Sequence, residues 1–188
     1  MVRPDRDLLC GDVEVDEVLV GGVNVGSPGV SGANVPVLVA VERSRGKRLG
    51  RMRTQVAAAP SSAQLVRFAA SVVEKGSTIH TDGTRTYRQP AGMGHTHDYV
   101  LAYKAEDPKT VLPGVHLIAS LLKRWLLGTL YHRVSAEHLA HYLDEYTFRF
   151  NRRTAKRRGL LFYRLLQQAV ATDPHPLHTL IKPGDPGW

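Results

Sequence analysis

The chain has 188 residues, which suits one domain with a substantial hydrophobic core and leaves little room for a second. Its 25 Lys and Arg residues outnumber the 17 Asp and Glu residues, so the formal net charge is +8. Ten basic but only three acidic residues lie between Leu121 and Arg164, and this segment alone carries a net charge of +7. The asymmetry predicts a polyanionic partner, either nucleic acid or an anionic membrane surface.

Cysteine content and hydropathy argue against a secreted or membrane-spanning protein. Cys10 is the only cysteine, so no internal disulfide can form, and this fits a reducing compartment. The longest apolar stretch, residues 111–130, is interrupted by His116, Lys123 and Arg124. No apolar segment of signal-peptide length lies near the start. We therefore expect a cytoplasmic protein that does not span a membrane.

The first predicted elements are strands. Apolar and acidic residues alternate over residues 13–20, which is typical of a strand and places Glu14 and Asp16 on one face. The Gly-, Ser- and Asn-rich residues 21–34 predict a linker or hairpin. The continuous apolar run over residues 36–42 then suits a buried central strand.

A helix and further strands follow. Residues 48–56 fit a third strand, and apolar residues at helical spacing predict an amphipathic helix from Ser62 to about Lys75. A short strand over residues 77–82 ends in an acid, Asp82. One more strand is possible near residues 99–103.

The C-terminal part is predicted to be helical. A helix from Gly114 has an apolar face and, at positions i, i+4 and i+7, a polar stripe of His116, Ser120 and Lys123. A second helix, capped by Ser135, has a predicted buried face made of Leu139, Tyr142, Leu143, Tyr146 and Phe150. A basic connection over residues 151–158 leads to a last helix over residues 159–171.

The placement of two acids suggests a chemistry. Asp16 lies on the first strand and Asp82 ends the fourth, and carboxylates on adjacent strands can hold Mg²⁺ ions for phosphoryl transfer. A solvated edge strand would also carry acids on its outer face. The spacing alone leaves both interpretations open.

Several blocks together resemble one family. They are Val-Glu-Val-Asp-Glu (13–17), Val-Gly-Gly (20–22), Val-Ala-Val-Glu (39–42), His-Thr-Asp-Gly (80–83), Pro-Gly-Val-His (113–116), Ser-Leu-Leu-Lys-Arg-Trp-Leu-Leu-Gly-Thr (120–129), His-Leu (138–139), Tyr-Leu-Asp-Glu (142–145) and Phe-Arg-Phe-Asn-Arg-Arg (148–153). The resemblance is to the integrase-like DDE domain of ISXO-type bacterial insertion-sequence transposases. It implies an α/β, RNase H-like fold, in which a mixed sheet is flanked by helices and followed by C-terminal basic helices.

The resemblance also implies a reaction and its residues. It implies metal-dependent DNA cleavage and strand transfer, with Mg²⁺ or Mn²⁺ held by Asp16, Asp82 and His116. His116 corresponds to the third catalytic residue of the family, which is Glu or Asn in many relatives. An imidazole at this position suits Mn²⁺ better than Mg²⁺. Lys123 corresponds to the basic residue that follows this position, where it would bind a DNA phosphate.

The resemblance implies a domain organisation and partners as well. Residues 1–11 are expected to be the remnant of a linker, and residues 12–171 the catalytic domain, with its basic helical part at about 131–171. Residues 172–188, rich in Pro and Gly, are expected to form a loosely ordered tail. Relatives carry a zinc ribbon and a helix-turn-helix segment before this domain, so we expect an N-terminally truncated transposase. It would act on DNA in the nucleoid, as a homodimer or higher oligomer.

Two alternatives remain at this point. The chain could be a catalytically inactive DNA-binding remnant, or a host nuclease with an RNase H-like fold. The basic residues are either a solvated face or DNA-binding residues, and their density favours contact with the DNA backbone. The predicted DNA-binding residues are Lys123, Arg124, Arg149, Arg152, Arg153, Lys156, Arg157 and Arg158.

Overall fold

The structure is a computed structural model, and it describes seven stretches of the chain: residues 6–20, 35–44, 48–58, 61–82, 94–99, 111–130 and 136–173. The predicted linker over residues 21–34, the predicted cap Ser135 and residues 174–188 of the predicted tail lie outside these stretches.

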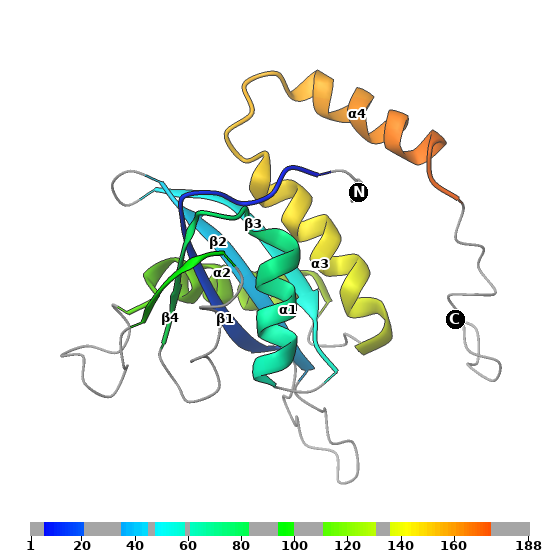
Figure 1. Cartoon of the computed structure of the whole chain (residues 1–188). Helices are drawn as coiled ribbons and strands as arrows, with labels where there is room; N and C mark the ends of the chain where they lie inside the picture. Colours follow the sequence, from blue (N-terminus) through cyan, green and yellow to red (C-terminus); the bar gives the residue numbers. More distant parts are fainter. Residues whose placement is uncertain are drawn as a thin grey trace, which may run out of the picture.

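A five-stranded mixed sheet forms the centre of the domain (Figure 1). The strand order is β3-β2-β1-β4-β5. The first three strands in the chain form an antiparallel meander, and β4 and β5 then join parallel to β1. The strands are β1 (Asp12–Val20), β2 (Val35–Arg43), β3 (Leu49–Val56), β4 (Thr78–Thr81) and β5 (Thr96–Tyr99).

Four helices complete the described part of the fold: α1 (Ser62–Val72), α2 (Pro113–Leu130), α3 (Ala136–Asn151) and α4 (Arg158–Val170). The predicted order of strands and helices is therefore confirmed. Two boundaries differ from the prediction. Helix α1 ends at Val72 because Val73 leaves it to form a β-bridge with Leu9. The last strand covers Thr96–Tyr99, earlier than predicted.

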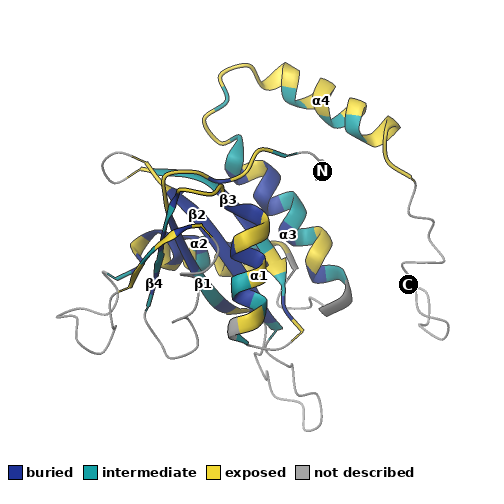
Figure 2. Cartoon of the chain, in the orientation of Figure 1, coloured by how far each residue is buried: buried dark blue, intermediate teal, exposed yellow. Residues whose placement is uncertain are grey.

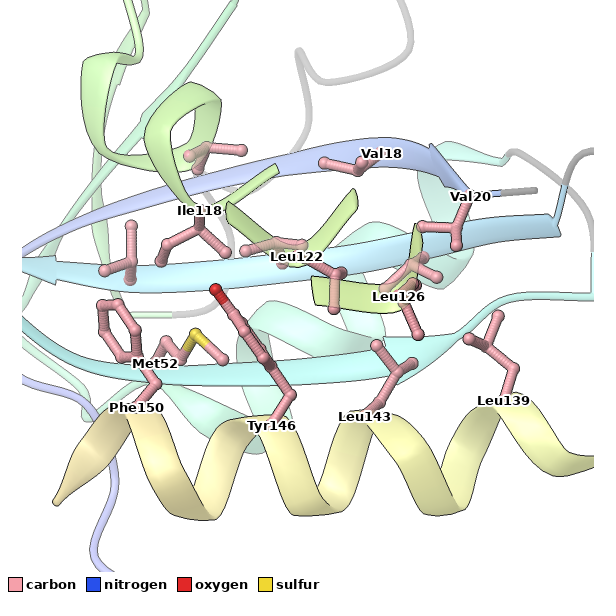
Figure 3. Close-up of a cluster of buried hydrophobic side chains, with 14 of the residues drawn as sticks. Val18, Val20, Met52, Ile118, Leu122, Leu126, Leu139, Leu143, Tyr146 and Phe150 are labelled. Carbon is pink, nitrogen blue, oxygen red and sulfur yellow. The ribbon is translucent and has the colours of Figure 1, made fainter. Parts of the chain in front are cut away.

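The two faces of the sheet bury separate hydrophobic clusters. Alternate residues of β1 divide between them, because successive side chains of a strand point to opposite faces. Val13 and Val15 pack in the cluster under α1. Val18 and Val20 pack in the other cluster, under α2 and α3. Figure 3 shows this second cluster, in which Ile118, Leu122 and Leu126 of α2 meet Leu139, Leu143, Tyr146 and Phe150 of α3 over the strands.

The C-terminal end of α3 covers the exposed edge of β3. The carboxamide of Asn151 accepts from the backbone N–H of Met52 at 2.8 Å and donates to its carbonyl at 3.0 Å. Farther along the same edge, the hydroxyl groups of Thr147 and Thr54 form a hydrogen bond of 3.0 Å. Unpaired backbone groups on an edge strand are open to pairing with other chains. The contacts of α3 give backbone groups of β3 hydrogen-bond partners and cover this edge against such pairing.

The segment before β1 is held against the domain. Leu9 is fully buried, its N–H donates to the carbonyl of Val72, and its carbonyl accepts from the N–H of Glu74. Two arginines of β3 bind the same segment, since Arg51 donates to the carbonyl of Leu8 and Arg53 to that of Asp7.

Helix α4 differs from the other helices in its burial. Figures 1 and 2 show it set apart from the sheet, and none of its residues is buried. Phe162, Tyr163 and Val170 are 66%, 58% and 89% exposed, so large apolar side chains of this helix lie open to solvent. No helix in the described stretches is long and apolar enough to cross a membrane.

Candidate active site

Asp16 lies near the middle of β1 in a mostly buried environment. Its pKa is raised from 3.8 to about 7, first by burial and also by the negative charge of nearby Asp82. The backbone N–H of Glu17 donates to Asp16 Oδ1 at 2.8 Å, which opposes the shift. Burial and a second acid both disfavour the ionised form of this carboxylate. A nearby cation would offset both effects, so the position is well suited to receive one.

The pairing of β1 with β4 explains why the two acids meet. In this parallel pair Asp12 aligns with Thr78 and Glu14 aligns with His80. The same register continued by two residues aligns Asp16 with Asp82, the residue directly after β4. The structure therefore brings together the two acids that the sequence placed on different strands.

Glu14, two residues before Asp16 on the same strand face, is fully buried. Its Oε2 accepts from the backbone N–H of Val115 at 2.9 Å, and its Oε1 lies 3.3 Å from Nε of Arg43. Gly114 makes this approach possible, since a Cβ at that position would lie 2.9 Å from Glu14 Oε2. Glu14 thus ties β1 to the first turn of α2.

His116 and Lys123, the other predicted catalytic residues, lie on the exposed side of α2. His116 directly follows Val115, the residue whose amide binds Glu14. The predicted polar stripe of His116, Ser120 and Lys123 is confirmed, and all three residues are exposed. The hydroxyl of Ser120 donates to the carbonyl of His116. Within the described stretches, however, no three His, Cys, Asp or Glu side chains are grouped so that they could hold a metal ion.

A histidine to which the sequence analysis gave no role, His80, lies between two other acids of the sheet. His80 Nε2 is 2.8 Å from Asp12 Oδ1, and His80 Nδ1 is 3.1 Å from Asp98 Oδ2. These contacts connect β1, β4 and β5 across the sheet. Alternation along β4 already puts His80 on the face of Asp82, but its two partners depend on strand register, which the sequence does not specify.

The predicted DNA-binding residues fall into two groups. Arg152 and Arg153 are engaged within the fold, because their guanidinium carbons lie 3.9 Å and 4.0 Å from the ring centroids of Phe148 and Phe150. Arg153 also donates to the carbonyls of Leu49 and Gly50. Arg153 is nevertheless exposed, as are the other predicted residues: Lys123, Arg124, Arg149, Lys156, Arg157 and Arg158, of which Arg149 pairs with Glu145 at 3.3 Å.

Comparison with known families adds the deciding observation. The family model of the ISXO2-like transposase domain matches residues 8–151, about three quarters of the chain. The chain belongs to this family. The match runs from the segment before β1 to the last residue of α3 and includes Asp16, Asp82, His116 and Lys123. No curated protein matches the chain.

Membership sets the general function of this ISXO2-like transposase domain. It makes the chain an insertion-sequence transposase, a class of proteins that bind DNA. DDE transposases are in general nucleases and strand transferases that use divalent metal ions. The coupled pair of Asp16 and Asp82 fits such an ion in charge and in ligand type, because carboxylate oxygens are preferred by Mg²⁺ and Mn²⁺.

Proposed function

We propose that this transposase domain is catalytic, and that it cleaves DNA and transfers the cut strand with divalent metal ions. We further propose that its fold is RNase H-like. The sheet order β3-β2-β1-β4-β5 supports this, with one acid on the central strand and the other directly after its parallel neighbour. The residues from about 12 to 171 would form this domain.

The observation that carries the proposal is the coupling of Asp16 with Asp82. Two carboxylates on one face of adjacent parallel strands repel each other, and this repulsion adds to the effect of burial on the pKa of Asp16. Such a pair would hold Mg²⁺ or Mn²⁺, which supplies an activated water or 3′-hydroxyl and stabilises the leaving oxygen. The two carboxylates themselves would hold the ion between β1 and β4.

Residues of α2 would complete the site. His116 would contribute a nitrogen ligand from the first turn of the helix, and an imidazole makes the site more favourable for Mn²⁺ than for Mg²⁺. Lys123 and Arg124, both exposed farther along α2, would bind phosphates of the DNA beside the acids.

A second basic surface would hold the DNA backbone farther from the site. It consists of Lys156, Arg157 and Arg158, which are exposed at the start of α4. Arg149 would assist from α3. Arg152 and Arg153 would contribute mainly by keeping this segment attached to β3, since their guanidinium groups already contact rings and carbonyls. We propose that the protein acts on DNA in the nucleoid as a dimer or higher oligomer.

The test is a cleavage assay with the purified chain. Labelled DNA that carries the ends of the element is incubated with Mg²⁺ or Mn²⁺, and the products are resolved on a denaturing gel. We expect nicking that requires the metal and is abolished by Asp16→Ala and by Asp82→Ala. Cleavage that persists in Asp82→Ala would refute the assignment.

A DNA-binding protein without cleavage activity is the second candidate. It is favoured by the absence of a grouped set of three metal-binding side chains in the described stretches and by the imidazole of His116 at the third position. This candidate predicts salt-sensitive DNA binding but no strand cleavage with either metal ion. Metal-dependent cleavage by the unaltered chain would eliminate it.

A further inference from the structure

The acids on β1 raise the question of what Glu14 does beside Asp16. By spacing alone Glu14 is as good a metal ligand as Asp16, since the two share one face of the strand. The structure separates their roles. Glu14 is fully buried: its Oε2 accepts from the N–H of Val115, and its Oε1, which makes no hydrogen bond, forms an ion pair with the guanidinium of Arg43.

The contact with Val115 acts on the start of a helix. The first N–H groups of an α-helix have no carbonyl partner within the helix, and Pro113, the first residue of α2, has no N–H at all. The carboxylate of Glu14 satisfies the amide of the third residue and places a negative charge where the helix dipole favours one. It thereby fixes this turn of α2 against β1.

Three consecutive residues of α2 show how closely the turn is fitted. Gly114 is buried, and a Cβ there would lie 2.8 Å from a Leu49 methyl carbon and 2.9 Å from Glu14 Oε2. Val115 is 1% exposed and packs in the cluster between α2 and the sheet. His116 comes next and is exposed. The buried residues fix the backbone from which the His116 side chain projects.

We infer that Glu14 is a positioning residue: it ties the first turn of α2 to β1 and so sets where His116 stands relative to Asp16 and Asp82. This inference rests on the proposed metal site. Residues that orient metal ligands without touching the metal change affinity by about 10- to 100-fold when they are removed. Glu14 would act in this way through the backbone of α2.

The experiment measures binding of Mn²⁺ alone to the purified chain, by the loss of the free-ion signal in electron paramagnetic resonance. It is performed at a temperature at which thermal unfolding curves show every variant to be folded. The altered chains are Glu14→Ala, which removes the tether, Glu14→Gln, which keeps an oxygen for the Val115 amide, and Gly114→Ala, which forces the carboxylate and the helix apart. Glu74→Ala, which removes an exposed acid beyond the end of α1, is the control.

We expect Glu14→Ala and Gly114→Ala each to weaken Mn²⁺ binding by at least about 10-fold. Glu14→Gln should retain most of the affinity, and Glu74→Ala should bind like the unaltered chain. If Glu14→Ala fails to fold, Gly114→Ala and Glu14→Gln still give the comparison.

Three results would overturn the inference. If Glu14→Gln binds as weakly as Glu14→Ala, the negative charge of Glu14 matters and not its hold on α2. If Glu14→Ala or Gly114→Ala lowers the melting temperature but binds Mn²⁺ normally when folded, the tether is only structural. If the unaltered chain does not bind Mn²⁺, the proposed metal site fails and the inference with it, which distinguishes that case from the other two.

Discussion

Replacing Asp16 with Asn should stabilise the domain at neutral and alkaline pH when no metal ion is present. In the folded chain the pKa of Asp16 is raised to about 7, from 3.8, chiefly by burial. Between pH 4 and 7 the unfolded chain has released this proton while the folded chain still binds it. The contribution of Asp16 to the free energy of unfolding therefore decreases as pH rises through this window and is constant above it.

The size of the effect follows from the shift. One pKa unit corresponds to about 1.4 kcal/mol, so the ionised side chain costs at most about 4 kcal/mol above pH 7. Water that reaches the partly exposed carboxylate lowers this free-energy cost to about 2 to 4 kcal/mol. For a chain of this size, that corresponds to a difference of roughly 5–15 °C in melting temperature. Asn removes the charge but keeps an oxygen for the N–H of Glu17.

The assay is thermal and urea unfolding of both chains in chelator, at intervals from pH 4 to 8. We expect Asp16→Asn to be more stable at pH 8 and the two chains to converge toward pH 4. Asp173→Asn, which removes an exposed carboxylate beyond α4, is the control and should show little difference at any pH. A difference between Asp16→Asn and the unaltered chain that does not vary with pH would refute the reasoning, as would an Asp16→Asn chain less stable at pH 8.

Three further predictions concern packing, the sheet edge and the basic residues. Leu122→Ala, which empties a fully buried position on α2, should lower the free energy of unfolding in urea by about 2 to 5 kcal/mol. Leu127→Ala on the same helix, 44% exposed, should change it by under about 1 kcal/mol, and equal losses would contradict the assigned core. Asn151→Ala leaves two backbone groups of the β3 edge without partners and should cost about 1 to 3 kcal/mol; unchanged hydrogen exchange at the Met52 amide would count against that contact. The double variant Arg157→Gln, Arg158→Gln should weaken DNA binding in fluorescence anisotropy and reduce the slope of log affinity against log salt by about 1 to 2. Arg153→Gln should instead lower stability more than DNA affinity, because that guanidinium contacts Phe150 and the carbonyls of β3.

The sequence predicted most of the elements because their signals are local. Period-two alternation marks β1, and helical spacing marks α2 and α3, whose predicted apolar residues are buried or half-buried. The signals were weakest where tertiary contacts decide. Thr96–Tyr99 has no apolar pattern, and its place in the sheet comes from pairing with β4. The end of α1 depends on Leu9, more than sixty positions away in the chain, through its bridge to Val73.

The basic run shows how composition can predict a partner without assigning residues. Six cations between residues 149 and 158 indicate a surface for a polyanion, and the spacing does not distinguish one cation from another. In the structure, Arg152 lies over the ring of Phe148, four residues earlier in the chain, and Arg153 lies over the ring of Phe150, three residues earlier. Lys156, Arg157 and Arg158 lie beyond α3, and they are exposed. Two cations of the run are therefore used by the fold as well, a division that the count does not show.

The acids of β1 show the same limit at the candidate site. Alternation places Glu14 and Asp16 on one face, and nothing local to the strand makes one of them buried and paired and the other open to Asp82. That distinction comes from the point where α2 meets the sheet, a contact between residues 101 positions apart. Because Gly114 brings the helix backbone next to Glu14, this carboxylate is used by the fold. Asp16, two residues farther along β1, is instead close enough to Asp82 for the charge of Asp82 to raise its pKa. The sequence can thus predict the acidic face, but only the packing of α2 decides which of its acids is held by the fold.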